Sequence, residues 1–188
     1  MSLEFWMSLT AIVLALLSLG FQALSTWRER VCLKVEQDKD HEAYSFPLMY
    51  IDRYDILFFR LSISNKAKSD VSIAKIVLRG KDGRSYLPEE YDLPDNHNKS
   101  GISFIMQDDS NHYLWFNLRS ENILDQLRIP AYGHVSGFVV FLNGPIVASA
   151  SETFKVEVLT STKVYTTMVT VEKLPENLIP SHALLPPG

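Results

Sequence analysis

The sequence predicts an all-β protein, an antiparallel immunoglobulin-like β-sandwich, preceded by one N-terminal transmembrane α-helix. Three observations predict this fold class. Residues 5–27 contain no charged side chain, whereas the rest of the chain is an ordinary polar mixture. From Val31 onward, apolar and polar residues mostly alternate, which is the two-residue period of half-buried strands. Turn signals separate about eight such segments, and no helical pattern alternates with them.

The N-terminal segment has the length and composition of a membrane-spanning helix. Its 23 uncharged residues form a helix of roughly 34 Å, enough to cross a hydrocarbon core of about 30 Å. Phe5 and Trp6 stand at one end and Trp27 at the other, where aromatic rings favour the membrane interfaces. Residues 1–30 are therefore expected to form a transmembrane anchor with a basic juxtamembrane end.

The charges that flank this segment predict its orientation. Glu4 is the only charged residue before it, whereas Arg28, Arg30, Lys34 and Lys39 follow it. Lys and Arg are retained on the cytoplasmic side. We therefore expect a single-pass protein of the inner or plasma membrane with its N-terminus outside and its main domain in the cytoplasm.

Two other interpretations of the segment place the domain outside. Ala23 and Ser25 have the small-residue spacing of a signal-peptide cleavage site, but a signal peptide has a basic N-terminal region and this one is acidic. An uncleaved signal anchor would instead hold an exported surface or periplasmic binding domain. The flanking charges favour the cytoplasmic placement over both.

One face of the predicted helix carries small or polar residues. They recur at alternating spacings of three and four, which places them on one side of a helix otherwise dominated by larger apolar residues. Small residues let helix backbones approach closely in lipid, and Ser or Gln can form hydrogen bonds across the contact. We expect this packing stripe to mediate self-association or contact with a partner's membrane helix; the alternative is a chance alignment. The stripe consists of Ser8, Ala11, Ala15, Ser18 and Gln22.

The remaining chain is expected to form the sandwich domain, residues 31–173. The pattern of residues 71–79 changes phase near Ala74 and Lys75, which predicts a β-bulge, and Asp82-Gly83 predicts a hairpin turn. The stretch SENILDQL is a short helical candidate, and residues 174–188 are predicted to be a Pro-rich extended or disordered tail. Strands are predicted at 31–37, 54–65, 71–79, 102–106, 112–116, 135–142, 153–159 and 163–172.

Two stretches carry a resemblance. In FFRLSISNKAKSDVSIAKIVLRGKDGRSY, a strand ends in Asn, Val-Ser-Ile follows, and a Gly-containing hairpin comes next; RIPAYGHVSGFVVF has an Ile-Pro start before a Gly and alternating aromatic and Val residues. Together with the helix that ends in TWRERVCLKV, they resemble uncharacterised single-span bacterial or prophage membrane proteins with an immunoglobulin-like β-sandwich domain. The resemblance implies a fold and a bacterial or phage origin, and it implies no activity.

The sequence contains no motif of a catalytic or metal site. Its five histidines have no metal-ligand spacing, its single cysteine permits no intramolecular disulfide, and residues 92–101 do not match a calcium loop. A nucleophile elbow is also missing. We therefore expect a non-catalytic protein without cofactor or metal; an enzyme that uses acidic loops with a metal is the less favoured alternative. The net charge of −4 argues against nucleic-acid binding.

Acidic residues are concentrated between residues 85 and 125. They predict either a surface that recruits a basic protein partner or ordinary solvated loops. With the anchor, the first alternative predicts a membrane-tethered interaction module for a protein partner. The candidate partner-binding residues are Glu89, Glu90, Asp92, Asp95, Asp108 and Asp109.

Overall fold

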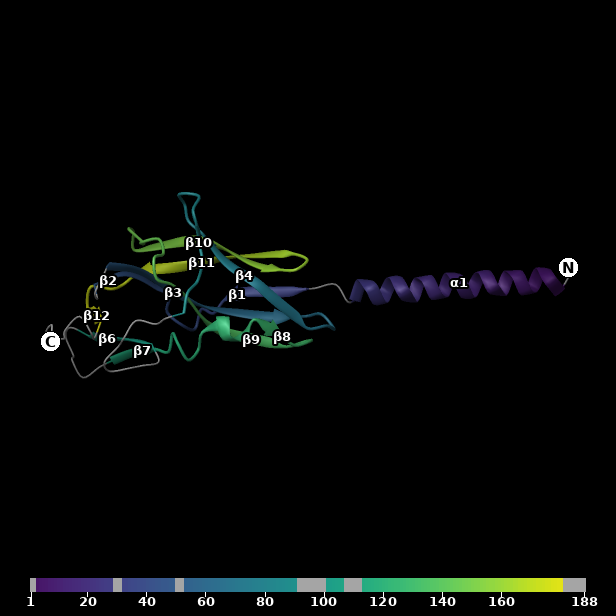
Figure 1. Ribbon diagram of the computed structural model, residues 1–188, viewed down its shortest axis with the longest axis horizontal. Helices are drawn as coiled ribbons and strands as arrows, with labels where there is room; N and C mark the ends of the chain where they lie inside the picture. Colours follow the sequence, from purple (N-terminus) through teal and green to yellow (C-terminus); the bar gives the residue numbers. More distant parts are fainter. Residues whose placement is uncertain (1–2, 29–31, 50–52, 91–100, 107–112, 181–188) are drawn as a thin grey trace.

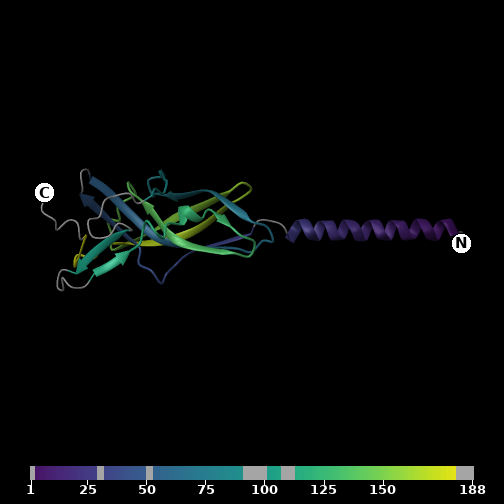
Figure 2. The same cartoon turned by 60° about the horizontal axis from the view of Figure 1, so that its bottom comes forward.

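The computed structural model describes residues 3–28, 32–49, 53–90, 101–106 and 113–180. Helix α1 (Leu3–Arg28) leaves one end of a β-rich domain in both views (Figures 1 and 2). Its segment Phe5–Thr26 has a mean hydropathy of 2.0 and none of it is buried against the described domain. Within the described residues, α1 is thus the one helix long and apolar enough to cross a membrane.

The domain is built on one curled, mixed sheet. The strands follow the order β1, β3, β2, β11, β10, β4, β5, with β9 paired to β3 and β8 paired to β4. Strands β2 and β11 run parallel, and the other named pairs are antiparallel. The bounds are β1 (Leu33–Gln37), β2 (Tyr44–Met49), β3 (Arg53–Asn65), β4 (Val71–Arg79), β5 (Ser85–Tyr86), β8 (Arg128–Ile129), β9 (His134–Phe141), β10 (Ser151–Thr160) and β11 (Val164–Lys173).

A second, smaller sheet covers part of the outer face of the first. It consists of β12 (Leu178–Pro180), β6 (Ile102–Met106) and β7 (Tyr113–Phe116), in that order. The long strand β3 separates two hydrophobic cores: Leu57 and Phe59 face the inside of the curled sheet, while Ile56 and Phe58 face the small sheet. Because both faces of β3 are covered, all four residues are fully buried.

The structure confirms the all-β prediction and several of its details. β9 pairs with the central strand β3 and is buried on both faces, as its continuous apolar run predicts. The predicted bulge is present, since Leu159 pairs with Lys75 and the next residue pairs with Ile73, which leaves Ala74 as the extra residue. The predicted hairpin joins β4 to β5, where Gly83 adopts a φ of 79°.

Other elements differ from the sequence prediction. The stretch SENILDQL contains only a 3-10 turn, η1 (Ile123–Gln126), capped by the Asn122 side chain, which accepts a hydrogen bond from the Leu124 N–H at 2.9 Å. Within residues 174–188, predicted as an extended or disordered tail, residues 178–180 form β12, which pairs with β6; residues 181–188 lie outside the described part, so the tail as a whole stays a prediction. The parallel pair and the curl depart from a purely antiparallel sheet, so the immunoglobulin-like description stays a prediction.

Candidate functional site

The main irregularity of the sheet lies between β1 and β2. Both strands pair with the same edge of β3: Gln37 stands opposite Leu61, and Tyr44 stands opposite Phe58. The six residues 38–43 therefore face only two residues of β3 and must leave the sheet. We call this segment the interruption loop.

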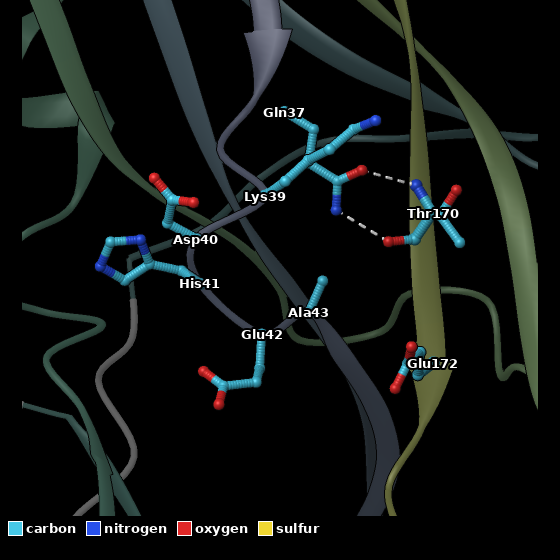
Figure 3. Close-up of a pocket in the computed structure, with 8 residues that line it drawn as sticks. All are labelled: Gln37, Lys39, Asp40, His41, Glu42, Ala43, Thr170 and Glu172. Atoms are coloured by element: carbon cyan, nitrogen blue, oxygen red, sulfur yellow. Dashed lines mark hydrogen bonds between the residues drawn. The ribbon is translucent and has the colours of Figure 1, made fainter.

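The side chain of Gln37 bridges the gap that the interruption loop leaves in the sheet. Its Nε2 donates a hydrogen bond to the Thr170 carbonyl at 2.8 Å, and its Oε1 accepts one from the Thr170 N–H at 2.8 Å (Figure 3). This pair of bonds reproduces the exchange that a strand residue makes with its neighbour. Backbone contact resumes where the Glu172 N–H donates to the Ala43 carbonyl at 2.9 Å.

An open groove of about 470 Å³ accompanies the loop, and Figure 3 shows the residues that line it. A second open groove, of about 530 Å³, shares Gln37, Lys39 and Asp40 with the first and is also lined by Ser62, His134 and Ser136. We call the first the interruption groove. It is lined by Gln37, Lys39, Asp40, His41, Glu42, Ala43, Thr170 and Glu172.

Three of the residues that line the interruption groove are acidic, Asp40, Glu42 and Glu172, and two of these lie near the start of β2. Burial raises the pKa of the Tyr44 hydroxyl, and the negative charges of Glu42 and Glu172 raise it further. Both carboxylates therefore act on the same buried group from the groove side. The arrangement favours a ligand that brings positive charge to Glu42 and Glu172.

A half-buried arginine anchors the base of the loop. The Arg60 Nε donates to the Ser136 Oγ at 3.1 Å and lies 3.5 Å from the Asp38 Oδ2, and its Nη1 bonds Glu121. The guanidinium also lies 5.2 Å from the centroid of the Phe138 ring. The Asp38 carboxylate is shared, because the His41 Nδ1 is 3.2 Å from its Oδ2.

The second carboxylate of this cluster titrates below its ordinary range. Burial raises the pKa of the Glu121 carboxyl, but hydrogen bonds from Asn117 and Arg60 and the positive charges of Arg60 and His41 outweigh burial and lower it. Asp38 and Glu121 thus serve as counter-ions of Arg60, and the lowered pKa of Glu121 does not favour that carboxyl as a proton donor near neutral pH. Across the described residues, no three His, Cys, Asp or Glu side chains converge as a metal site.

The structure separates the residues predicted from sequence. All five residues of the packing stripe lie exposed on α1, away from the domain. Glu89 and Glu90 are exposed in the segment after β5, where the Glu89 N–H donates to the Val140 carbonyl at 2.9 Å. The remaining acidic candidates, Asp92, Asp95, Asp108 and Asp109, lie outside the described residues.

Sequence reasoning did not identify the interruption groove. The signal that could have revealed it is the polar run DKDHEA, residues 38–43, which stands between the alternating pattern that ends at Gln37 and the apolar residues that begin at Tyr44. A polar run of this length between two apolar segments predicts a loop. The contact between this loop and β11 depends on the pairing of segments that are distant in the sequence, which a local pattern does not reveal.

Comparison with known proteins adds no family. No protein-family model and no curated protein matches this chain. A family 123 glycoside hydrolase from Clostridium perfringens is similar in part, with a TM-score of 0.33 and 12% sequence identity over 77% of this chain. The chain spans 27% of the length of that hydrolase. A similarity this distant assigns neither a fold nor an activity.

Proposed function

We propose that this chain is a membrane-tethered, non-catalytic interaction module whose immunoglobulin-like domain lies on the cytoplasmic face. One observation carries the tether: large apolar side chains are exposed all along α1, among them Leu14, Leu16 and Phe21, at 66%, 63% and 73%. No described part of the domain covers them. Lipid is the solvent that removes such a surface from water, and the helix satisfies its own backbone there.

The proposed orientation rests on the flanking charges. Arg28 and Arg30 follow the apolar segment and only Glu4 precedes it, which favours a cytoplasmic domain. An exported domain held by an uncleaved signal anchor is the alternative that topology mapping would reveal. Extraction of membranes with alkaline carbonate tests the tether itself, because an inserted helix stays in the pellet.

Cysteine labelling tests the orientation in intact cells. A Cys32→Ser chain with Thr153→Cys places one thiol at an exposed position of β10. A membrane-impermeant maleimide should label it only after the cells are permeabilised. Labelling of intact cells would refute the cytoplasmic placement and make the exported binding domain the better proposal.

The interruption groove is our proposed contact for the partner. Lys39, Asp40, His41 and Glu42 are all exposed there on a loop that a rigid sheet holds at both ends. The charges of Glu42 and Glu172 favour a partner segment that carries Lys or Arg. A non-catalytic role fits the engagement of Asp38 and Glu121 with Arg60.

Two charge-reversal variants distinguish the interruption groove from the acidic residues at positions 89–95 as the partner-binding surface. If the groove binds, Glu42→Lys with Glu172→Lys should abolish recovery of the partner after cross-linking in cells. If the acidic loop binds instead, reversal of Glu89, Glu90, Asp92 and Asp95 to Lys should abolish it and the groove variant should not. Recovery unchanged in both variants would contradict acidic recognition altogether.

A further inference from the structure

The end of the domain that carries the start of β1 must lie close to the membrane. Only residues 29–32 separate the last residue of α1 from Leu33, and an extended chain of that length spans at most about 17 Å. The headgroup layer of each leaflet adds roughly 5 to 7 Å beyond the hydrocarbon core. Loops at this end of the domain are therefore within reach of lipid headgroups.

Three turns meet at this end beside the start of β1. Leu33 pairs with Asn65, where the turn 65–70 begins, and the Lys66 N–H donates to the Cys32 carbonyl at 2.8 Å. The Asn65 N–H donates to the Gly133 carbonyl at 2.9 Å, which joins the turn 130–133. The hairpin 160–163 leads into β11, whose Tyr165 interacts with the Leu33 backbone; Figures 1 and 2 show the strand ends gathered where α1 departs.

The first two turns form a fixed platform because one buried side chain joins them. Asn65 is only 2% exposed. Its Nδ2 donates to the Ser69 carbonyl at 2.8 Å and to the Pro130 carbonyl at 2.9 Å, while its Oδ1 accepts from the Ala67 N–H at 2.9 Å. The side chain thus uses both ends of its amide to lock the turns together.

The platform presents an aromatic side chain to solvent. Tyr132 has a φ of 55°, a left-handed conformation that is uncommon for a bulky residue, and its N–H donates to the Ala67 carbonyl at 3.2 Å. Although the backbone is held in this strained state, the side chain is 66% exposed. A Tyr with an apolar ring and a polar hydroxyl prefers the interface between lipid and water.

The three turns at this end of the domain carry more basic than acidic residues. The segments 65–70, 128–133 and 160–163 carry Lys66, Lys68, Arg128 and Lys163 against Asp70, a balance of four minus one, or +3, in a chain of net charge −4. Arg128 is the residue that neutralises Asp70, since its Nη2 lies 3.0 Å from the Asp70 Oδ2. The three lysines are exposed.

We propose that this membrane-proximal surface docks onto anionic lipid headgroups of the membrane that α1 spans. Lys66, Lys68 and Lys163 contact lipid phosphates, and Tyr132 places its ring among the headgroups. The inference rests on the proposed tether, because α1 holds the surface at its ligand. Positive charge at this end of an acidic chain is complementary to an anionic membrane surface, and each Lys or Arg near such a surface adds to the attraction. Docking would hold the domain upright on the membrane.

Headgroup quenching tests the inference with the full chain in vesicles. A fluorophore is placed on Ser69→Cys in a Cys32→Ser background, and the lipid headgroups carry a spin-label quencher. The vesicles contain phosphatidylcholine alone or phosphatidylcholine with phosphatidylglycerol. We expect strong quenching with phosphatidylglycerol, weak quenching without it, and loss of the difference at high salt, because salt screens the attraction.

Matched lysine variants assign the effect to this surface. Each of Lys66→Gln, Lys68→Gln and Lys163→Gln should lower the docked-to-free ratio about fivefold. The same charge change at Lys75, Lys81 and Lys155, exposed lysines of β4, the β4–β5 turn and β10, should leave the quenching unchanged. Tyr132→Ser should weaken docking without removing its dependence on phosphatidylglycerol.

The possible failures are distinguishable. Quenching that is independent of phosphatidylglycerol, or equal in the variants of Lys66, Lys68 and Lys163 and in the control variants of Lys75, Lys81 and Lys155, would overturn the lipid inference while the tether stands. Such a result is expected if the natural ligand of this surface is a protein and not lipid, because no other protein is present in the vesicles. A chain that alkaline carbonate strips from the vesicles would overturn the tether, and the docking inference with it.

Discussion

Replacement of Gln37 by Leu tests whether one side chain closes the sheet across the interruption loop. The change removes two hydrogen bonds to Thr170, each 2.8 Å long. A typical hydrogen bond contributes a net of about 1 kcal/mol, so the pair contributes about 2 kcal/mol. Thr170 is exposed, and water can satisfy its peptide groups after the change. We therefore expect the free energy of unfolding to fall by about 1 to 2 kcal/mol and not by the larger cost of orphaned groups.

The assay combines global and local measurements on the full chain in detergent. Urea unfolding gives the change in free energy, and amide hydrogen exchange reports the Thr170 N–H directly, since it loses its acceptor. Gln37→Glu is the informative second variant: it keeps an acceptor for the Thr170 N–H but places a carboxylate against the Thr170 carbonyl. Protonation at acidic pH should then recover part of the lost stability, because the acid form donates a hydrogen bond.

A control and a refuting result complete this test. Gln126→Leu changes an exposed glutamine of η1 and should leave both measurements unchanged. If Gln37→Leu unfolds at the same urea concentration as the parent chain and the Thr170 amide keeps its protection, the side-chain bridge does not hold the sheet. In that case the bond between Gln37 and Thr170 would not hold β1 and β11 together beside the interruption groove.

Three further predictions concern the arginine cluster, a close backbone approach and the helix. Because the pKa of Glu121 is lowered in the fold, its stabilising effect is present above its unfolded pKa of about 4.3 and disappears as the pH falls through the folded value. Urea unfolding of Arg60→Met should show about 1 kcal/mol lost at pH 7. The difference from the parent chain should narrow in acid without vanishing, because the contacts of Arg60 with Ser136 and Phe138 do not depend on the ionisation of Glu121. In Gly137→Ala, the new Cβ would lie 2.6 Å from the Glu121 carbonyl oxygen, so thermal unfolding should show a loss of about 1 to 3 kcal/mol, whereas Gly20→Ala, with open space around it, should not affect the domain. Ala11→Leu with Ala15→Leu should weaken cross-linking between helices if the packing stripe makes contact, and unchanged cross-linking would remove the stripe from the proposal.

Much of the sheet follows from local patterns. In β10, Phe154, Val156 and Val158 are buried and Lys155 is exposed, because a strand with one covered face alternates with a period of two. The Ala74 bulge was predictable for the same reason, since an extra residue reverses the phase of the alternation. Such features depend on residues that are close together in the sequence, so they can be predicted from it.

The candidate site depends instead on contacts between distant segments. The run that forms β2 contains Pro47, which lacks the N–H that a strand residue usually donates and weakens the strand pattern. When β2 is not predicted, the polar run before it is interpreted as an ordinary loop between strands. The bond between Gln37 and Thr170 joins positions 133 residues apart, and a local pattern contains no information about that pairing. The same reason hides the Asn65 network, which draws on two turns about 65 residues apart.

The two proposed surfaces assign different tasks to the two kinds of charge in this chain. The turns beside the start of β1 carry Lys66, Lys68 and Lys163, while Glu42 and Glu172 lie where β2 begins, farther along the edge of β3. An acidic groove would be repelled by an anionic membrane, and screening weakens that repulsion beyond about 8 to 10 Å. A domain docked through its basic end therefore keeps the groove away from the lipid. A partner with a basic segment is attracted to the anionic membrane surface as well as to Glu42 and Glu172, so the membrane would concentrate such a partner near the domain and the groove would bind it.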